Sequence, residues 1–99
     1  MIAIQIQDER GQVLETFEDP RAVYDILPPA GDREGCCLRF IDPYGDTTFN
    51  QAQVTELLSE INSRLEGVAP EAQVRVLKLV RFIEQAVNQV HLYLKFVGD

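Results

Sequence analysis

The chain has 99 residues, of which 45% are hydrophobic and 25% are charged, so we expect one folded domain that spans residues 1–99. The net charge of −7 comes mainly from residues 1–50, and no basic run or basic helix face occurs, which argues against nucleic-acid binding because phosphates are bound by Lys and Arg. No apolar segment reaches the ~20 residues that cross a bilayer, and the N-terminus alternates apolar and polar residues instead of forming a leader, so we expect a cytoplasmic protein without membrane contact.

The first elements form a predicted β-hairpin. Three isoleucines alternate with Ala and Gln, which predicts a strand over residues 2–7. A turn-forming stretch follows, and residues 12–17 form a second β-prone run. Asp19 then precedes a proline, so it is placed as the N-cap of a short helix over residues 21–27.

A third β-prone run is followed by a turn with the sequence Asp-Pro-Tyr-Gly-Asp. We predict a strand over residues 36–41, and residues 47–49 are either a fourth strand or an extended approach to the next helix. Cys36 and Cys37 are adjacent in this run, so they point to opposite faces of a strand, and a disulfide between them would be strained. Both thiols are expected to be reduced, and no metal site is expected because the chain has no second Cys or His pair.

Two helices are predicted in the second half of the chain. Asn50 is followed three residues later by Gln53, the pattern of a capping box, so the first helix covers about residues 51–66. The second helix covers residues 70–90 or beyond, and its apolar face is broader than one contact stripe requires. We expect a second copy of the chain to cover part of it. The residues of this candidate dimer face are Val76, Val80, Ile83, Val87, Val90 and Leu94.

Residues 91–97 fit two structures. Their period-two alternation and their β-forming residues are typical of a final strand. However, no Gly, Pro or tight-turn pair separates them from the preceding helix, which favours a helix that continues to about Leu94. In both cases the expected fold class is α+β, with a small antiparallel sheet of three or four strands packed by two C-terminal helices.

The turn supplies the main candidates for chemistry. Asp42, Tyr44 and Asp46 can present two carboxylates and a phenol to one patch of solvent; alternatively, Asp42 is structural and accepts hydrogen bonds from the turn backbone. The only histidine, His91, and Tyr93 are further candidate binding or interface residues, since His titrates near neutral pH and Tyr offers contact area with a polar tip. No nucleophile elbow, phosphate loop or metal-ligand cluster occurs, so we assign no catalytic residue, cofactor or metal.

Two segments resemble those of small uncharacterised bacterial proteins of about this length. They are FIDPYGDTTFN at residues 40–50 and HLYLKFVGD at residues 91–99. The resemblance implies a bacterial, cytoplasmic product of one domain, and it carries no known activity across. It also suggests that the two segments meet in space, which would place His91, Tyr93 and Asp99 near the turn.

The main functional hypothesis is a non-enzymatic interaction protein, which acts as a homodimer or as a binder or small acidic inhibitor of another bacterial protein. The broad apolar helix, the acidic N-terminal half and the lack of a catalytic constellation support it. The alternative is a small metabolite-binding protein or enzyme that uses Asp42, Tyr44 and Asp46 with His91. This alternative requires those side chains to converge on one pocket.

Overall fold

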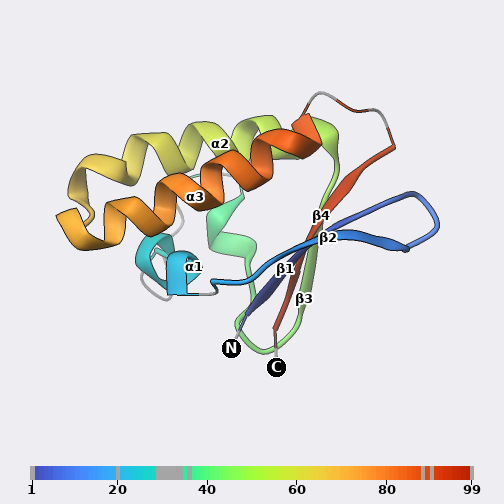
Figure 1. The fold of residues 1–99 in the computed structure, drawn as a ribbon, viewed down its shortest axis with the longest axis horizontal. Coiled ribbons are helices and arrows are strands. Elements are labelled where there is room, and N and C mark those ends of the chain that lie inside the picture. Colours follow the sequence, from blue (N-terminus) through green and yellow to red (C-terminus); the bar gives the residue numbers. More distant parts are fainter. Residues whose placement is uncertain are drawn as a thin grey trace.

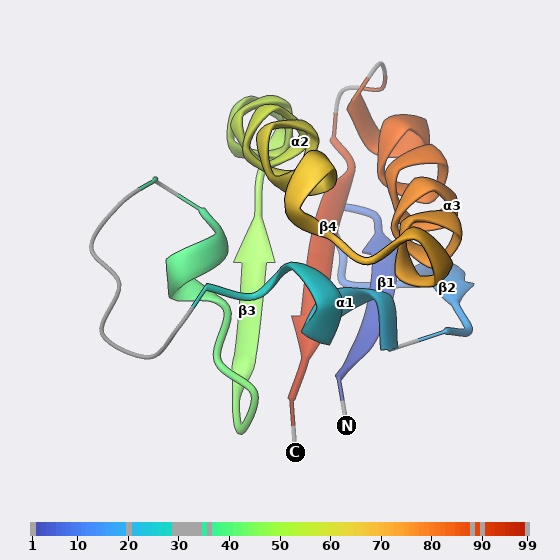
Figure 2. The same ribbon diagram turned by 90° about the vertical axis from the view of Figure 1, so that its left-hand side faces the viewer.

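The computed structural model describes residues 2–19, 21–28, 35, 37–87, 89 and 91–98. Over these residues the chain has an α+β fold, as predicted, in which helices cover one face of a four-stranded antiparallel sheet (Figures 1 and 2). The strands are β1 (Ala3–Gln7), β2 (Val13–Phe17), β3 (Asp46–Phe49) and β4 (Tyr93–Val97). The α-helices are α1 (Arg21–Ile26), α2 (Gln51–Arg64) and α3 (Pro70–Val87), and two short 3-10 helices are η1 (Leu38–Phe40) and η2 (Leu65–Gly67).

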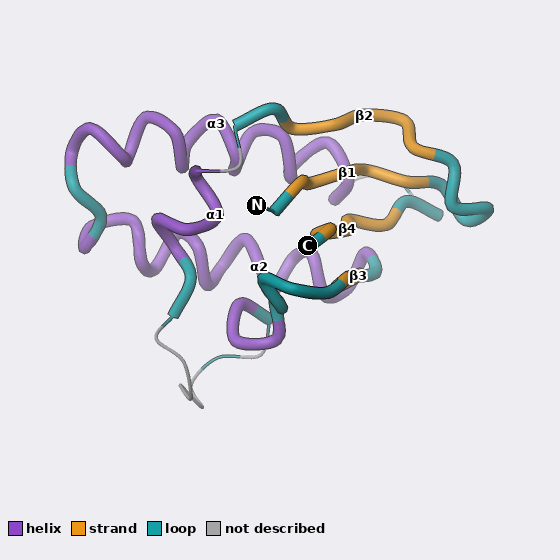
Figure 3. The backbone as a smooth tube through the Cα atoms, turned by 90° about the horizontal axis from the view of Figure 1, so that it is seen from below, coloured by secondary structure: helices purple, strands orange, loops and turns teal. Residues whose placement is uncertain are grey.

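The strand order is β2-β1-β4-β3, so the C-terminal strand lies in the middle of the sheet and β2 lies at one edge (Figure 3). α3 lies over the β1 and β2 side and α2 over the β3 and β4 side (Figure 2). Alternate side chains of the central strands point toward these helices, and Ile4, Ile6, Leu94 and Phe96 are buried there. The other face of the sheet carries the half-exposed residues of the same strands, as is common for antiparallel sheets.

The expectation that the last helix continues to about Leu94 is wrong. α3 ends at Val87, and residues 93–97 form β4, which pairs with β1 on one side and with β3 on the other. The turn before β4 contains no glycine. His91 takes the left-handed backbone conformation there, with φ of 72°. Histidine is one of the residues that tolerate this region better than most. Residues 47–49 are likewise a strand, within β3.

The predicted strand over residues 36–41 is also corrected. Residues 38–40 form the 3-10 helix η1, in which the backbone N–H of Phe40 donates to the carbonyl of Cys37 over 3.0 Å. Leu38 is buried and Phe40 is 55% exposed, whereas in a strand these two side chains would share a face. Position 36 lies outside the described residues.

The helix predicted over residues 51–66 is confirmed as α2, which continues into η2. Asn50 is its N-cap: the side chain accepts a hydrogen bond of 3.0 Å from the backbone N–H of Gln53, and the Gln53 side chain accepts one of 2.9 Å from the backbone N–H of Asn50. This reciprocal capping box satisfies two of the N–H groups that a helix start leaves unpaired.

Most of the candidate dimer face is covered by the chain's own elements, and the association of two copies stays a prediction. Val76, Ile83 and Leu94 have no exposed surface, Val80 is 7% exposed and Val87 is half-buried, while Val90 lies outside the described residues. The buried part of the apolar face of α3 contacts the sheet, α2 and α1, whereas Val74 and Leu77 on the same helix are 56% and 44% exposed. Leu94 belongs to β4 and not to the helix.

Candidate functional site

The turn between η1 and β3 is built around the carboxylate of Asp42. The side-chain Oδ1 of Asp42 accepts a hydrogen bond of 2.8 Å from the backbone N–H of Tyr44. The backbone carbonyl of Asp42 accepts one of 3.3 Å from the backbone N–H of Gly45. Tyr44 is 84% exposed, and Asp46 lies 3.4 Å from the Nζ of Lys95 on β4. Asp42 therefore has the structural role that the sequence offers as the alternative to ligand binding.

The two segments that carry the resemblance are neighbours in the sheet, but they do not bring His91 to the turn. β3 and β4 are antiparallel, and Asp46 is opposite Val97. Tyr93 lies at the other end of β4, roughly 13 Å along the strand from Val97, and His91 precedes it. Asp99 lies outside the described residues. The turn and the histidine consequently do not line one pocket.

The His91 side chain lies instead beside the tip of the β1–β2 hairpin. Its Nδ1 is 3.3 Å from Oε2 of Glu9, and both side chains are mostly exposed. A recess of about 250 Å³ beside it is lined by His91, Leu92 and Tyr93 and by residues 50–52 at the start of α2, and none of these described lining residues carries a carboxylate. Glu9 therefore approaches His91 from the hairpin and is not among the residues that line the recess.

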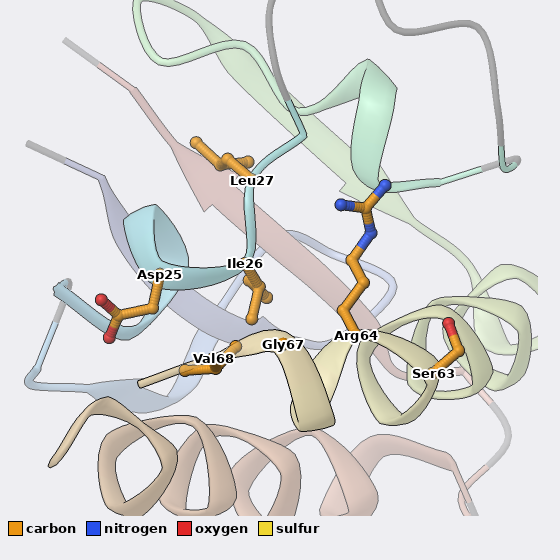
Figure 4. A pocket seen from close by; sticks show the side chains of 7 residues that line it. All are labelled: Asp25, Ile26, Leu27, Ser63, Arg64, Gly67 and Val68. Atoms are coloured by element: carbon orange, nitrogen blue, oxygen red, sulfur yellow. The ribbon is translucent and has the colours of Figure 1, made fainter. Parts of the chain in front are cut away.

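A larger groove of about 300 Å³ lies between α1 and the end of α2 (Figure 4). Its lining residues are Asp25, Ile26, Leu27, Ser63, Arg64, Gly67 and Val68. Asp25 and Arg64 lie on opposite sides of Ile26 and point in different directions (Figure 4). The Asp25 carboxylate accepts two hydrogen bonds, of 3.0 and 3.2 Å, from the Arg75 guanidinium on α3. The polar groups of this groove therefore do not converge on a ligand position, and its carboxylate joins α1 to α3.

The edge strand β2 offers a different kind of site. Its residues 13–16 are exposed, and they include two large apolar side chains, Val13 at 44% and Leu14 at 49%. The register with β1 shifts here: Glu15 is opposite Ile6 but Val13 is opposite Gln7, so Leu14 is the extra residue of a β-bulge. Exposed apolar residues on a sheet edge are unusual, since an open edge can pair with another chain.

The two edges of the sheet differ in how they are covered. Beside β3, the Oγ1 of Thr47 donates a hydrogen bond of 3.3 Å to the Phe40 carbonyl and accepts one of 3.2 Å from the backbone N–H of Asp42. η1 therefore lies next to that edge (Figure 2). Along the outer edge of β2, no part of the described chain forms a paired strand (Figures 2 and 3). The hairpin also extends beyond the helices (Figure 1).

The hairpin is strongly acidic. From the end of β1 to the residue after β2, residues 8–18 carry Asp8, Glu9, Glu15 and Glu18 against a single base, Arg10. Asp8 is used locally, because its Oδ1 accepts hydrogen bonds of 2.9 Å from two backbone N–H groups of its own turn. Glu15 and Glu18 have no ion-pair partner within the residues that the structure describes. Their charge is therefore directed at solvent along the open edge.

A recess of about 180 Å³ connects this edge to the last turns of α3. It is lined by Ile6, Leu14, Glu15, Gln85, Gln89 and Leu92, and so it combines an apolar floor with one carboxylate and two amides. The sequence predicts the hairpin itself, but the open edge is not among its candidate sites. The one local signal in the sequence is the adjacent apolar pair Val13-Leu14 beside acidic residues. Such a pair is equally typical of a buried strand in the core.

Comparisons with protein-family models, with curated proteins and with solved structures gave no match. The described ranges contain no group of three or more His, Cys, Asp or Glu side chains placed to hold a metal ion. None of the helices in those ranges is both long enough and apolar enough to cross a bilayer.

Proposed function

We propose that this protein is a non-enzymatic binding protein, which recognises another protein of basic charge through the β1–β2 hairpin. The observation that carries the proposal is the combination of Val13 and Leu14, exposed on an open sheet edge, with Glu15 and Glu18, which have no ion-pair partner among the described residues. Apolar side chains supply contact energy when they are covered, and unpaired carboxylates select a cationic partner.

The charge of the hairpin also favours rapid encounter with such a partner. An acidic surface attracts a basic protein over distances of about a Debye length, roughly 8–10 Å at ordinary ionic strength, and raises the association rate. A small acidic protein that covers a functional surface of a basic one acts as its inhibitor. We therefore infer inhibition or sequestration of the partner as the biological role.

A different protein suits this edge better than a second copy of the chain. If two β2 strands paired with each other, the carboxylates of Glu15 and Glu18 would be brought toward those of the other copy, and like charges on paired strands are destabilising. On the face of α3 expected to form a dimer, Val76, Val80 and Ile83 are buried within one chain. Both observations favour a heteromeric complex.

Photo-crosslinking from the edge strand tests this proposal. A photoreactive residue at exposed Thr16 should capture a basic protein in the cells that produce this chain, whereas the same residue at exposed Ser59 on α2 should not. The charge reversal Glu15→Lys with Glu18→Lys should abolish the capture.

The matched control changes the net charge equally at a distance from the hairpin. Glu66→Lys with Glu71→Lys replaces two exposed carboxylates in η2 and at the start of α3, and it should leave the capture unchanged. Equal loss in both double variants would show that only the net charge of the protein matters. Equal crosslinking from positions 16 and 59 would refute recognition by the hairpin.

A further inference from the structure

We infer that the basic partner binds by strand addition: an extended segment of it pairs with β2 and continues the sheet outward. This inference rests on the proposed function of the hairpin and specifies the form of the partner. The occupant is a segment in which lysine or arginine alternates with apolar residues. Three features of the edge carry the inference, namely its unpaired backbone, its recess and its bulge.

The backbone of β2 is available for pairing. β2 lies at the end of the order β2-β1-β4-β3, so one row of its N–H and C=O groups is used by β1 and the other row faces outward. The strand has five residues, which corresponds to roughly 17 Å of extended chain. The opposite edge of the sheet lies beside η1, so the two edges are not equivalent acceptors for a strand.

The recess determines which side chains fit. Glu15 is opposite Ile6 on β1, whose buried side chain points toward the helices, so Glu15 lies on the helix side of the edge. An incoming residue on that side would lie between Leu14 and Gln85 in the recess. A lysine or arginine fits this position, because its aliphatic stem can cover Leu14 while its charge meets the Glu15 carboxylate.

The bulge limits how far the pairing can extend. Leu14 has no partner on β1, and such an extra residue bends the strand and interrupts regular pairing. Regular pairing is therefore available along residues 15–17, next to the recess. This arrangement accepts a short guest segment and disfavours unlimited edge-to-edge association, which bulges and charges prevent on natural sheet edges.

Synthetic peptides test the inference directly. The probe is a fluorescent peptide of about nine alternating lysine and valine residues, the length of an ordinary strand. It should bind the full-length protein and slow hydrogen exchange of β2 amide protons, with no slowing in β3. The same peptide with alternate backbone nitrogens methylated keeps its charge but cannot donate the ladder hydrogen bonds, and it should bind at least about tenfold more weakly. A glutamate and valine peptide should not bind.

The double variants used above serve as controls for charge. Glu15→Lys with Glu18→Lys should abolish peptide binding, and Glu66→Lys with Glu71→Lys should retain it. Strand addition would be overturned if the methylated peptide bound as tightly as the unmethylated one, or if hydrogen exchange of the β2 amides did not change. The proposed function would still stand in that case, provided that crosslinking at Thr16 remained sensitive to the hairpin charge. If β2 amide protection rose with the concentration of the protein alone, the occupant would be a second copy and the inference of a basic partner would fail.

Discussion

The backbone N–H of Gly98 donates a hydrogen bond of 2.8 Å to the carbonyl oxygen of Gly45, and this bond ties the end of β4 to the turn before β3. It continues the β3–β4 pairing one step beyond Asp46 and Val97. The two backbones are so close that a Cβ on Gly98 would lie 2.5 Å from the Gly45 oxygen and 2.6 Å from that of Asp42. A close backbone approach therefore accounts for the glycine at position 98, whereas a Cβ on Gly45 would meet the Asp42 carboxylate, with Oδ2 at 2.8 Å.

Gly98→Ala should destabilise the protein. The atoms in the way of the new methyl group are backbone atoms that cannot rotate aside, so the strands must shift, at a cost of about 1–3 kcal/mol in the free energy of unfolding. Urea denaturation measures this difference. Gly67→Ala is the matched control, because a Cβ there meets no atom within 4 Å. If the two variants had equal stability, the close contact at Gly98 would be refuted.

Some elements could be predicted from the sequence because their local signals agree. The N-terminal strand follows a strict alternation of isoleucines, and α2 begins at a complete capping box with Asn50. Residues 36–41 and 91–97 are both short apolar runs with β-forming residues, and local pattern does not separate them. Long-range pairing separates them: residues 93–97 pair with β1 and β3, and residues 38–40 remain outside the sheet.

The candidate site was harder to predict, because it depends on strand order. Val13 and Leu14 resemble core residues in the sequence, and they are exposed because β4 pairs with the other side of β1 and leaves β2 at the edge. The prediction that His91 lies near the turn is wrong for a similar reason. The two segments do pair, but the antiparallel direction puts His91 at the opposite end of the strand from Asp46.

Ile83→Ala should destabilise the folded chain by about 2–5 kcal/mol, because Ile83 has no exposed surface and its truncation leaves a cavity between α3 and its neighbours. Val74→Ala, on the exposed side of the same helix at 56% exposure, should change stability by less than about 0.5 kcal/mol. Thermal unfolding measures both effects. The midpoint of the Ile83 variant should not depend on protein concentration; a clear dependence would show that copies of the chain associate.

Arg75→Met should weaken the attachment of α1 to α3. The Asp25 side chain is 20% exposed, and in the variant its carboxylate lacks the two hydrogen bonds that it accepts from Arg75. We therefore expect the free energy of unfolding to fall by about 1–3 kcal/mol. The double variant with Asp25→Asn should lose less than the sum of the two single variants, because neither charge is then left alone. Strict additivity in denaturant unfolding would show that the pair contributes nothing.

Arg21 should hold the pKa of Asp19 below its ordinary value. The main cause is the hydrogen bonding of the Arg21 side chain to both carboxylate oxygens, at 2.9 and 3.1 Å, and the positive charge of Arg21 adds to it. The ionised carboxylate also accepts a hydrogen bond of 3.3 Å from the backbone N–H of Arg21 at the start of α1. A carboxyl titration followed by NMR should therefore give a pKa below the ordinary 3.8.

The sign of the linked effect on stability follows from this lowered pKa. Because the folded state binds the Asp19 proton less tightly than the unfolded chain, the contribution is fully present above the ordinary pKa of 3.8 and is lost as the pH falls through the lower folded value. Arg21→Gln should return the pKa toward 3.8 and remove this part of the acid dependence of unfolding. Arg10→Gln, a substitution of equal charge on the hairpin tip, should leave the Asp19 titration unchanged. An unchanged Asp19 pKa in the Arg21 variant would show that the pair seen in the structure is not formed in solution.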